Sequence, residues 1–142
     1  MRQFRRIRSM AVVGLVAASA MTGQTVVQAS GPPIPRELVG SYYVHAGGMT
    51  VRKNGVVKVT YQWYFKRDHG LPSFPRLSLK VRSVRGNVLR GKVTSETEAL
   101  VGVGRKFTAK HVAPGYELHF AGLSRVWRFC DRAHQAAGAC GA

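Results

Sequence analysis

From Leu38 onward, apolar and polar residues alternate in short runs that are separated by Gly, Pro and Asn. Alternation with a period of two is typical of strands that bury one face, and such punctuation is typical of hairpins. Only the tail from Asp131 to Ala142 favours a short helical turn. The chain is therefore predicted to be all-β, a small antiparallel barrel or sandwich of about seven to eight strands.

The stretch VRKNGVVKVTYQWYF, residues 51–65, shows how the alternation fixes a strand register. A two-residue Asn-Gly loop would place Val51 opposite Lys58, whereas a three-residue loop (53–55) pairs Val51 with Val57 on one apolar face. The glycine of that loop then takes the left-handed position of a bulged turn. We predict the three-residue loop, and it places Tyr61, Trp63 and Phe65 on the inward face.

The hairpin before it accommodates a two-residue loop at Gly47-Gly48. That loop would place Val44 across from Val51 and would point His45 outward. His45 is therefore interpreted as a solvated strand residue rather than a catalytic group.

The stretch RLSLKVRSVRGNVLRGKVTS, residues 76–95, alternates in the same way and predicts a hairpin with a three-residue loop at 85–87. Like charges that face each other across two strands lower stability. Two such pairs on one outward face indicate either a solvated charged face or a surface retained for an anion. The anion-binding hypothesis names Arg82 opposite Arg90 and Lys80 opposite Lys92.

FTAKHVAPGYELHF, residues 107–120, predicts another hairpin around Pro114-Gly115, and RVWRFC, residues 125–130, predicts the last strand. The alternation turns His111 inward. An inward histidine is usually a core residue with a satisfied hydrogen bond, yet it could also line a small ligand cavity. The cavity hypothesis names Tyr42, Tyr61, Trp63 and His111.

Residues 1–29 have the pattern of a cleaved secretory signal peptide: four arginines without an acid, a short apolar stretch, and small residues before Ser30. The apolar stretch is too short to span a bilayer, which takes roughly 20 residues. A proline-rich segment, residues 30–37, and a single β-domain, residues 38–142, would follow. Secretion into the extracellular space or cell envelope is therefore expected.

The chain is strongly basic. It has 22 Lys and Arg residues against six acids, and removing the four arginines of the signal leaves 18 against six, a net charge of +12. Such a field attracts polyanions. An anionic polymer, membrane or cell-wall surface is the expected partner, and no motif for specific nucleic-acid binding is evident.

Cys130 and Cys140 are the only cysteines. Export to an oxidising compartment favours a disulfide between them, which would close the C-terminal tail. The alternative is a metal site that adds His134 to the two thiolates. A structural zinc site normally needs four ligands, and no fourth ligand is evident nearby, so no metal is expected.

No pattern specific to catalysis is present. The nucleophile-elbow, phosphate-loop and HExxH motifs are all missing. Glu96 and Glu98 are the only close pair of carboxylates, and they fall at a strand end or in a loop rather than across a cleft. We therefore expect no enzymatic activity and no cofactor.

LVGSYYVHAGGMTVRKNG, residues 38–55, and AHQAAGACGA, residues 133–142, resemble the start and end of a set of small secreted actinobacterial proteins of unknown function. That resemblance implies secretion and a small disulfide-closed β fold, and it implies no mechanism. The Gly-Ser-Tyr-Tyr start at residues 40–43 is also similar to the first strand of avidins and lipocalins, which are small barrels.

Together these patterns predict a secreted basic β-domain that binds anionic cell-envelope or extracellular material. The alternative is a small barrel that carries an apolar ligand. An envelope hydrolase has the least support.

Overall fold

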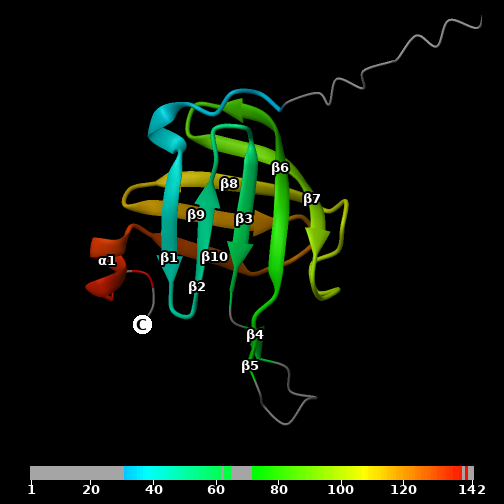
Figure 1. Cartoon of the computed structure of the whole chain (residues 1–142), viewed down its shortest axis with the longest axis vertical. Coiled ribbons are helices and arrows are strands. Elements are labelled where there is room, and N and C mark those ends of the chain that lie inside the picture. The colour runs from blue at the N-terminus through cyan, green and yellow to red at the C-terminus, as the bar shows by residue number, and fades with distance from the viewer. Residues whose placement is uncertain (1–30, 62, 65–71, 139, 141–142) are drawn as a thin grey trace, which may run out of the picture.

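The computed structural model describes residues 31–61, 63–64, 72–138 and 140, which form a closed eight-stranded antiparallel barrel (Figure 1). Each strand lies beside the next strand along the chain, except that a two-stranded ribbon is inserted after the third strand. The predicted all-β antiparallel fold is confirmed, and it is a barrel. The barrel strands are β1 (Gly40–Val44), β2 (Gly47–Val51), β3 (Val56–Thr60), β6 (Arg76–Arg85), β7 (Val88–Glu96), β8 (Lys106–Val112), β9 (Gly115–Phe120) and β10 (Val126–Cys130); the ribbon is β4 (Trp63–Tyr64) and β5 (Pro72–Ser73); the helical turns are η1 (Arg36–Leu38) and α1 (Arg132–Ala136).

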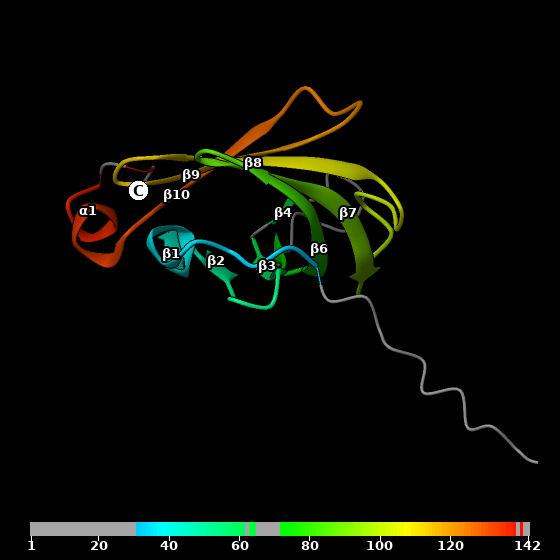
Figure 2. The same cartoon turned by 90° about the horizontal axis from the view of Figure 1, so that it is seen from above.

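The barrel is flattened into two facing layers. Figure 1 shows β8, β9 and β10 running across the direction of β1, β2 and β3, and Figure 2 shows the two groups facing each other. β6 and β7 join the layers on one side, because β6 pairs with β3 and β7 pairs with β8. We call β6 and β7 the corner. On the opposite side the layers meet where β1 pairs with β10, which we call the seam.

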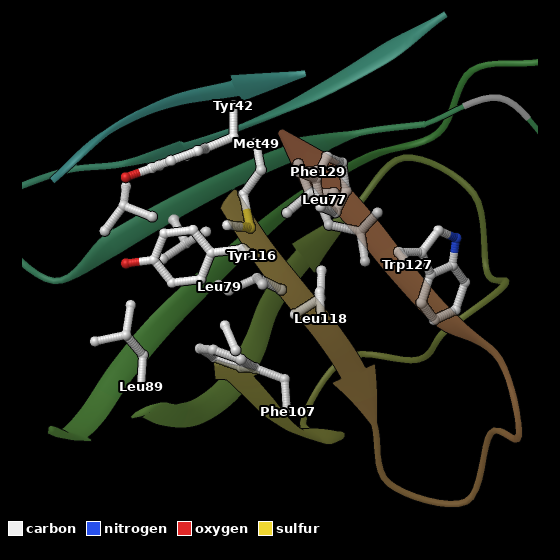
Figure 3. Close-up of a cluster of buried hydrophobic side chains, with 14 of the residues drawn as sticks. Tyr42, Met49, Leu77, Leu79, Leu89, Phe107, Tyr116, Leu118, Trp127 and Phe129 are labelled. Carbon is white, nitrogen blue, oxygen red and sulfur yellow. The ribbon is translucent and has the colours of Figure 1, made fainter. Parts of the chain in front are cut away.

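The corner is built from the two longest strands, and both carry an irregularity that lets them bend. The pairing shifts by one residue between Ser78 and Leu79, where Thr94 is the extra residue, and again where Arg82 is the extra residue. Such bulges bend a strand and increase its twist. The inward side chains of both strands pack in the core, as Figure 3 shows for Leu77, Leu79 and Leu89.

Because of the second bulge, the register and the turn of the β6–β7 hairpin differ from the prediction. Lys80 lies opposite Lys92 as predicted, but Ser83, and not Arg82, is the partner of Arg90. The turn therefore has two residues, 86–87, instead of three. The physical reason is that the extra residue reverses the alternation, so that Val84 packs against the core instead of pointing outward.

The seam contains much less strand pairing. In the described residues Tyr43 and Cys130 are the one register pair between β1 and β10. α1 follows directly, and the guanidinium of Arg132 lies 5.2 Å from the centre of the Tyr43 ring. The predicted disulfide between Cys130 and Cys140 is present, so the tail after α1 is tied back to the end of β10.

The β2–β3 hairpin has the predicted register: Val51 pairs with Val57, and Gly55 has a φ of 76°. The β1–β2 hairpin differs from the prediction, because its turn is at residues 45–46 and the two glycines lie in β2. A Cβ on Gly47 would approach the Thr60 carbonyl oxygen to 2.4 Å, so this glycine permits close packing of strands rather than a turn.

The second half of the chain follows its predicted faces. Phe107, Ala109 and Leu118 are buried, and the β8–β9 turn is at residues 113–114, with a cis Ala113-Pro114 peptide bond. Trp127 and Phe129 of β10 point into the core, as expected (Figure 3).

The proline-rich segment packs against the barrel. Ile34 and Leu38 are buried, and the hydroxyl of Tyr116 donates a 2.7 Å hydrogen bond to the carbonyl oxygen of Leu38. The predicted signal peptide, residues 1–29, and Phe65 lie outside the described residues, and for Trp63 only the backbone is described. Within the described part of the chain, none of the helices has the length and apolar character needed to cross a membrane.

Candidate functional site

Six basic side chains lie on the outer surface of three adjacent strands. The buried neighbours of each residue show why: Leu79 and Val81 point inward from β6, Gly91 and Val93 from β7, and Phe107 from β8. The residues beside them point outward, because successive side chains of a regular strand face opposite sides. Arg82, the extra residue of the bulge, is exposed as well. We call this set the basic band, and it consists of Lys80, Arg82, Arg90, Lys92, Lys106 and Lys110.

Three lysines of the band form a row across the strands. Lys92 pairs with Lys80 on one side and with Lys106 on the other. Directly opposite side chains have Cβ atoms about 4.5–5.5 Å apart, so the three charges repel one another. A row of this kind lowers stability, and it also concentrates positive potential on one strip of the wall.

The position of Arg82 differs from the predicted one. It is the extra residue of the bulge, and it is exposed beside Arg90 rather than paired with it. Lys80 is half-buried, and its Nζ donates a 3.3 Å hydrogen bond to the carbonyl oxygen of Asn54 in the β2–β3 turn. The four residues named from the sequence therefore lie on one surface, but Lys80 is anchored to a neighbouring turn.

The geometry of the corner depends on Gly91. A Cβ at this position would lie 1.9 Å from the Lys80 carbonyl oxygen and 2.8 Å from a ring carbon of Phe107. β6 and β7 can therefore approach closely only because residue 91 has no side chain. This approach holds Lys80 and Lys92 side by side.

No carboxylate of the described residues lies within ion-pair distance of the band. Glu117 is opposite Lys110 in the register, but its carboxylate is 3.2 Å from Nε of Arg128. Glu96 at the end of β7 accepts hydrogen bonds from three backbone N–H groups, those of residues 100–102. The charge of the band is therefore screened by solvent ions rather than by the protein.

The hydrogen bonds to Glu96 also stabilise the glycine-containing loop that follows β7. The backbone N–H groups of residues 100–102 converge on the carboxylate of Glu96. Glu96 thus stabilises the loop through its carboxylate.

The four residues of the cavity hypothesis fall into separate groups. Tyr42 and His111 are neighbours, with ring centres 6.1 Å apart, and both pack against Tyr116. Tyr61 packs instead against Trp127, with ring centres 5.4 Å apart. The side chain of Trp63 lies outside the described residues. The structure therefore joins two of the four residues and places the third beside a different ring.

The environments of these tyrosines favour the neutral phenol. Burial raises the pKa of Tyr61 to about 12, and the carboxylate of Glu96 adds to the rise. Burial also raises the pKa of Tyr116 and that of Tyr42. These rings consequently act as uncharged packing groups at neutral pH.

A surface depression of about 290 Å³ lies beside the disulfide, outside the basic band. It is lined by the β8–β9 turn, the end of β10 and Cys140, and it includes the ion pair of Glu117 and Arg128. None of the four residues of the cavity hypothesis lines this depression. Its volume is at the lower limit of ordinary ligand pockets.

The C-terminal residues that could have formed a metal site have other roles. Cys130 and Cys140 are joined, with Cα atoms 5.8 Å apart. Asp131 caps α1, because its Oδ1 accepts from the backbone N–H of His134 at 2.9 Å and lies 2.8 Å from the ring Nδ1. These bonds lower the pKa of the Asp131 carboxyl.

Lys106 and Lys110 were not recognised from the sequence, although the signal was present. Phe107 and Ala109 alternate with them, which predicts that both lysines point outward. What the sequence alone could not provide was the pairing of β8 with β7, which brings Lys106 beside Lys92.

Comparison with known proteins adds no precedent. No protein-family model, no curated protein and no solved structure matches this chain. The function must therefore be inferred from the chemistry of the described residues.

Proposed function

We propose that this protein is a secreted, non-enzymatic β-barrel that binds anionic cell-envelope or extracellular material through the basic band. The observation that carries the proposal is the row of Lys80, Lys92 and Lys106, three directly adjacent like charges with no carboxylate of the described residues beside them. A row that costs stability is retained most simply if a ligand neutralises it.

Export is part of the proposal, and two features support it. Residues 1–29 have the composition of a signal peptide, and the disulfide is the state expected for cysteines in an oxidising compartment. Mass spectrometry of the protein from the culture medium should give a chain that begins at Ser30 with its cysteines joined. A retained N-terminus would contradict the export proposal and leave the basic band to be tested separately.

Retention on an immobilised anionic polymer tests the band. The variant Lys80→Gln/Arg82→Gln/Arg90→Gln/Lys92→Gln should elute at a clearly lower salt concentration than the unaltered protein, because fewer counterions are released on binding. A control variant loses the same charge at exposed cations outside both the band and the seam: Arg36→Gln/Lys58→Gln/Arg76→Gln/Arg85→Gln.

Equal shifts for the two variants would mean that net charge, and not the band, determines retention. The single substitution Lys92→Gln separates binding from folding, because it should weaken retention yet raise the free energy of unfolding by a few tenths of a kcal/mol. A loss of both would show that Lys92 acts through the structure.

Carriage of an apolar ligand is the second candidate, and the contact of Tyr42 with His111 supports it. Extraction of the purified protein with organic solvent followed by mass spectrometry would reveal a carried molecule. Its release should be insensitive to salt, whereas binding to the band should weaken steeply as salt rises.

A further inference from the structure

We propose that the partner of the basic band is a linear, flexible polyanion that lies across the strands and follows the curve of the corner, and not a membrane surface. This inference rests on the proposed function, because it names the partner class of the same site. Four properties of the band support it: its length, its curvature, its polarity and its boundaries.

The band is too long for a single anionic group. The lysine row crosses β8, β7 and β6, and it continues to the β2–β3 turn, because Lys80 contacts Asn54 there and Val81 donates a backbone hydrogen bond to Gly55. The turn adds the exposed cations Arg52 and Lys53. With neighbouring strands about 4.8 Å apart, this track is roughly 14 Å long. One ligand must therefore carry several charges along its length to use it.

The track lies on a convex wall. Figure 2 shows β6 and β7 bending from the layer that contains β8 to the layer that contains β3. The row starts on β8 in one layer, crosses β7 and β6, and reaches the β2–β3 turn in the other layer, so it passes around the corner. A flat lipid surface can touch only part of a convex wall, whereas a flexible chain can bend around it.

The lysine row and the arginines beside it lie on a mainly polar surface. The large apolar side chains that are exposed in the described residues are Phe74, Val103, Val112 and Val126. None of them belongs to β6 or β7, and Val112 is at the far end of β8 from Lys106. Thr108 lies between Lys106 and Lys110 and opposite Arg90, where a hydroxyl can contribute to binding an oxyanion. Peripheral membrane attachment normally combines cations with apolar groups that enter the bilayer, and β6 and β7 expose no large apolar side chain beside the lysine row.

Acidic residues mark where the track ends. Beyond Lys110, the next strand presents Glu117; β7 ends at Glu96, and Glu98 is in the loop that follows it. Towards β3 and the β2–β3 turn, no acid of the described residues interrupts the cations. A bound chain is therefore expected to run from β8 over the corner to the β2–β3 turn.

The experiment compares three probes with the purified protein at several NaCl concentrations. They are long-chain inorganic polyphosphate, inorganic triphosphate, and vesicles of phosphatidylglycerol and phosphatidylcholine. The test variant is Lys92→Gln/Lys106→Gln, and the matched control is Arg36→Gln/Arg76→Gln, which removes the same charge from exposed sites outside the band.

We expect polyphosphate to bind much more tightly than triphosphate or vesicles. The test variant should bind polyphosphate roughly tenfold more weakly, and its slope of log K against log [NaCl] should be less steep by about 1.4, since two contacts are lost. The control variant should match the unaltered protein in both quantities.

Four results would overturn the inference in different ways. Vesicles that bind as tightly as polyphosphate, with the same loss in the test variant, would show that the band serves a membrane, and the proposed function would stand. Triphosphate that binds as tightly as polyphosphate would show a single-anion site. Equal losses in test and control variants, or no binding of any probe, would overturn the proposed function as well.

Discussion

The corner and the seam close the same barrel by different means. At the corner, β6 and β7 pair along nearly their whole length, and two bulges and Gly91 let the paired strands bend from one layer to the other. At the seam, one register pair joins β1 to β10, and the rest of the closure comes from side chains, α1 and the disulfide-tied tail.

The difference shows which side of the barrel can carry charge. Backbone hydrogen bonds hold the corner together whatever side chains point outward, so its outer surface can accommodate a row of mutually repelling lysines. The seam depends on specific side chains such as Tyr43, Tyr116 and Arg132. Substitutions on its surface would weaken closure directly. The basic band thus lies where the fold tolerates it best.

The largest expected effect comes from breaking the corner. Gly91→Ala should lower the free energy of unfolding by about 3 kcal/mol or more, because the added methyl group would overlap the backbone of Lys80. Denaturation by urea measures it. Gly86→Ala is the control: its φ is 54° but no atom lies within 4 Å of the added group, so only about 1 kcal/mol of backbone strain is expected. Similar costs at both sites would rule out the close-approach explanation.

An intermediate effect is expected from loosening the seam. Cys140→Ser removes the disulfide, whose loop is short, and should cost about 2–3 kcal/mol on the chain-entropy estimate. Amide hydrogen exchange should then speed up in β1 and β10 and remain slow in β6 and β7. Treatment of the unaltered protein with a reductant should have the same effect, and the variant should not respond to it. Uniform acceleration across all strands would contradict a locally weak seam.

The smallest effect concerns one hydrogen bond that spans the barrel next to the seam. Tyr116→Phe removes the donor to the buried Leu38 carbonyl and should cost about 1–2 kcal/mol. Because burial raises the pKa of Tyr116 in the folded state, its contribution is complete below its ordinary value of 10 and is lost as the pH rises through the folded pKa. Stability measured above pH 10 should therefore fall less in the variant. Identical alkaline profiles would show that Tyr116 is not responsible.

Much of the fold could be predicted because alternation reports which face of a strand is buried. The pairing of Val51 with Val57 follows from that rule alone, and so does the inward direction of Trp127. The rule fails where the alternation reverses within a strand. At Arg82 the sequence contains no sign of the bulge, which bends β6 where it pairs with β7.

The glycines of the first hairpin illustrate a second limit. Gly47 and Gly48 resemble a turn in the sequence, yet they lie within β2, and the turn is two residues earlier, at 45–46, with Ala46 at a φ of 54°. A glycine can serve a turn or a close contact, and only the position of Thr60 distinguishes the two.

Only part of the candidate site could be predicted, because the sequence indicates local register but not the order of strands around the barrel. Lys80 and Lys92 belong to one hairpin, so their juxtaposition follows from a local register. Lys106 comes from a strand beyond a loop, and its place beside Lys92 depends on the order of strands around the barrel. Local pattern determines which way a side chain points, whereas topology determines which charges it meets.

The order of strands also has a consequence for how the chain reaches its native state. Apart from the β4–β5 insertion, each barrel strand pairs with its neighbour in sequence, so most of the sheet can assemble through local contacts, which favour rapid folding. The pairing of Tyr43 with Cys130 is the exception, since it joins the first strand to the last. Until β10 arrives, β1 has an open edge that another copy could extend into an aggregate. Closure of the seam is therefore the step at which this protein is most exposed to misassembly.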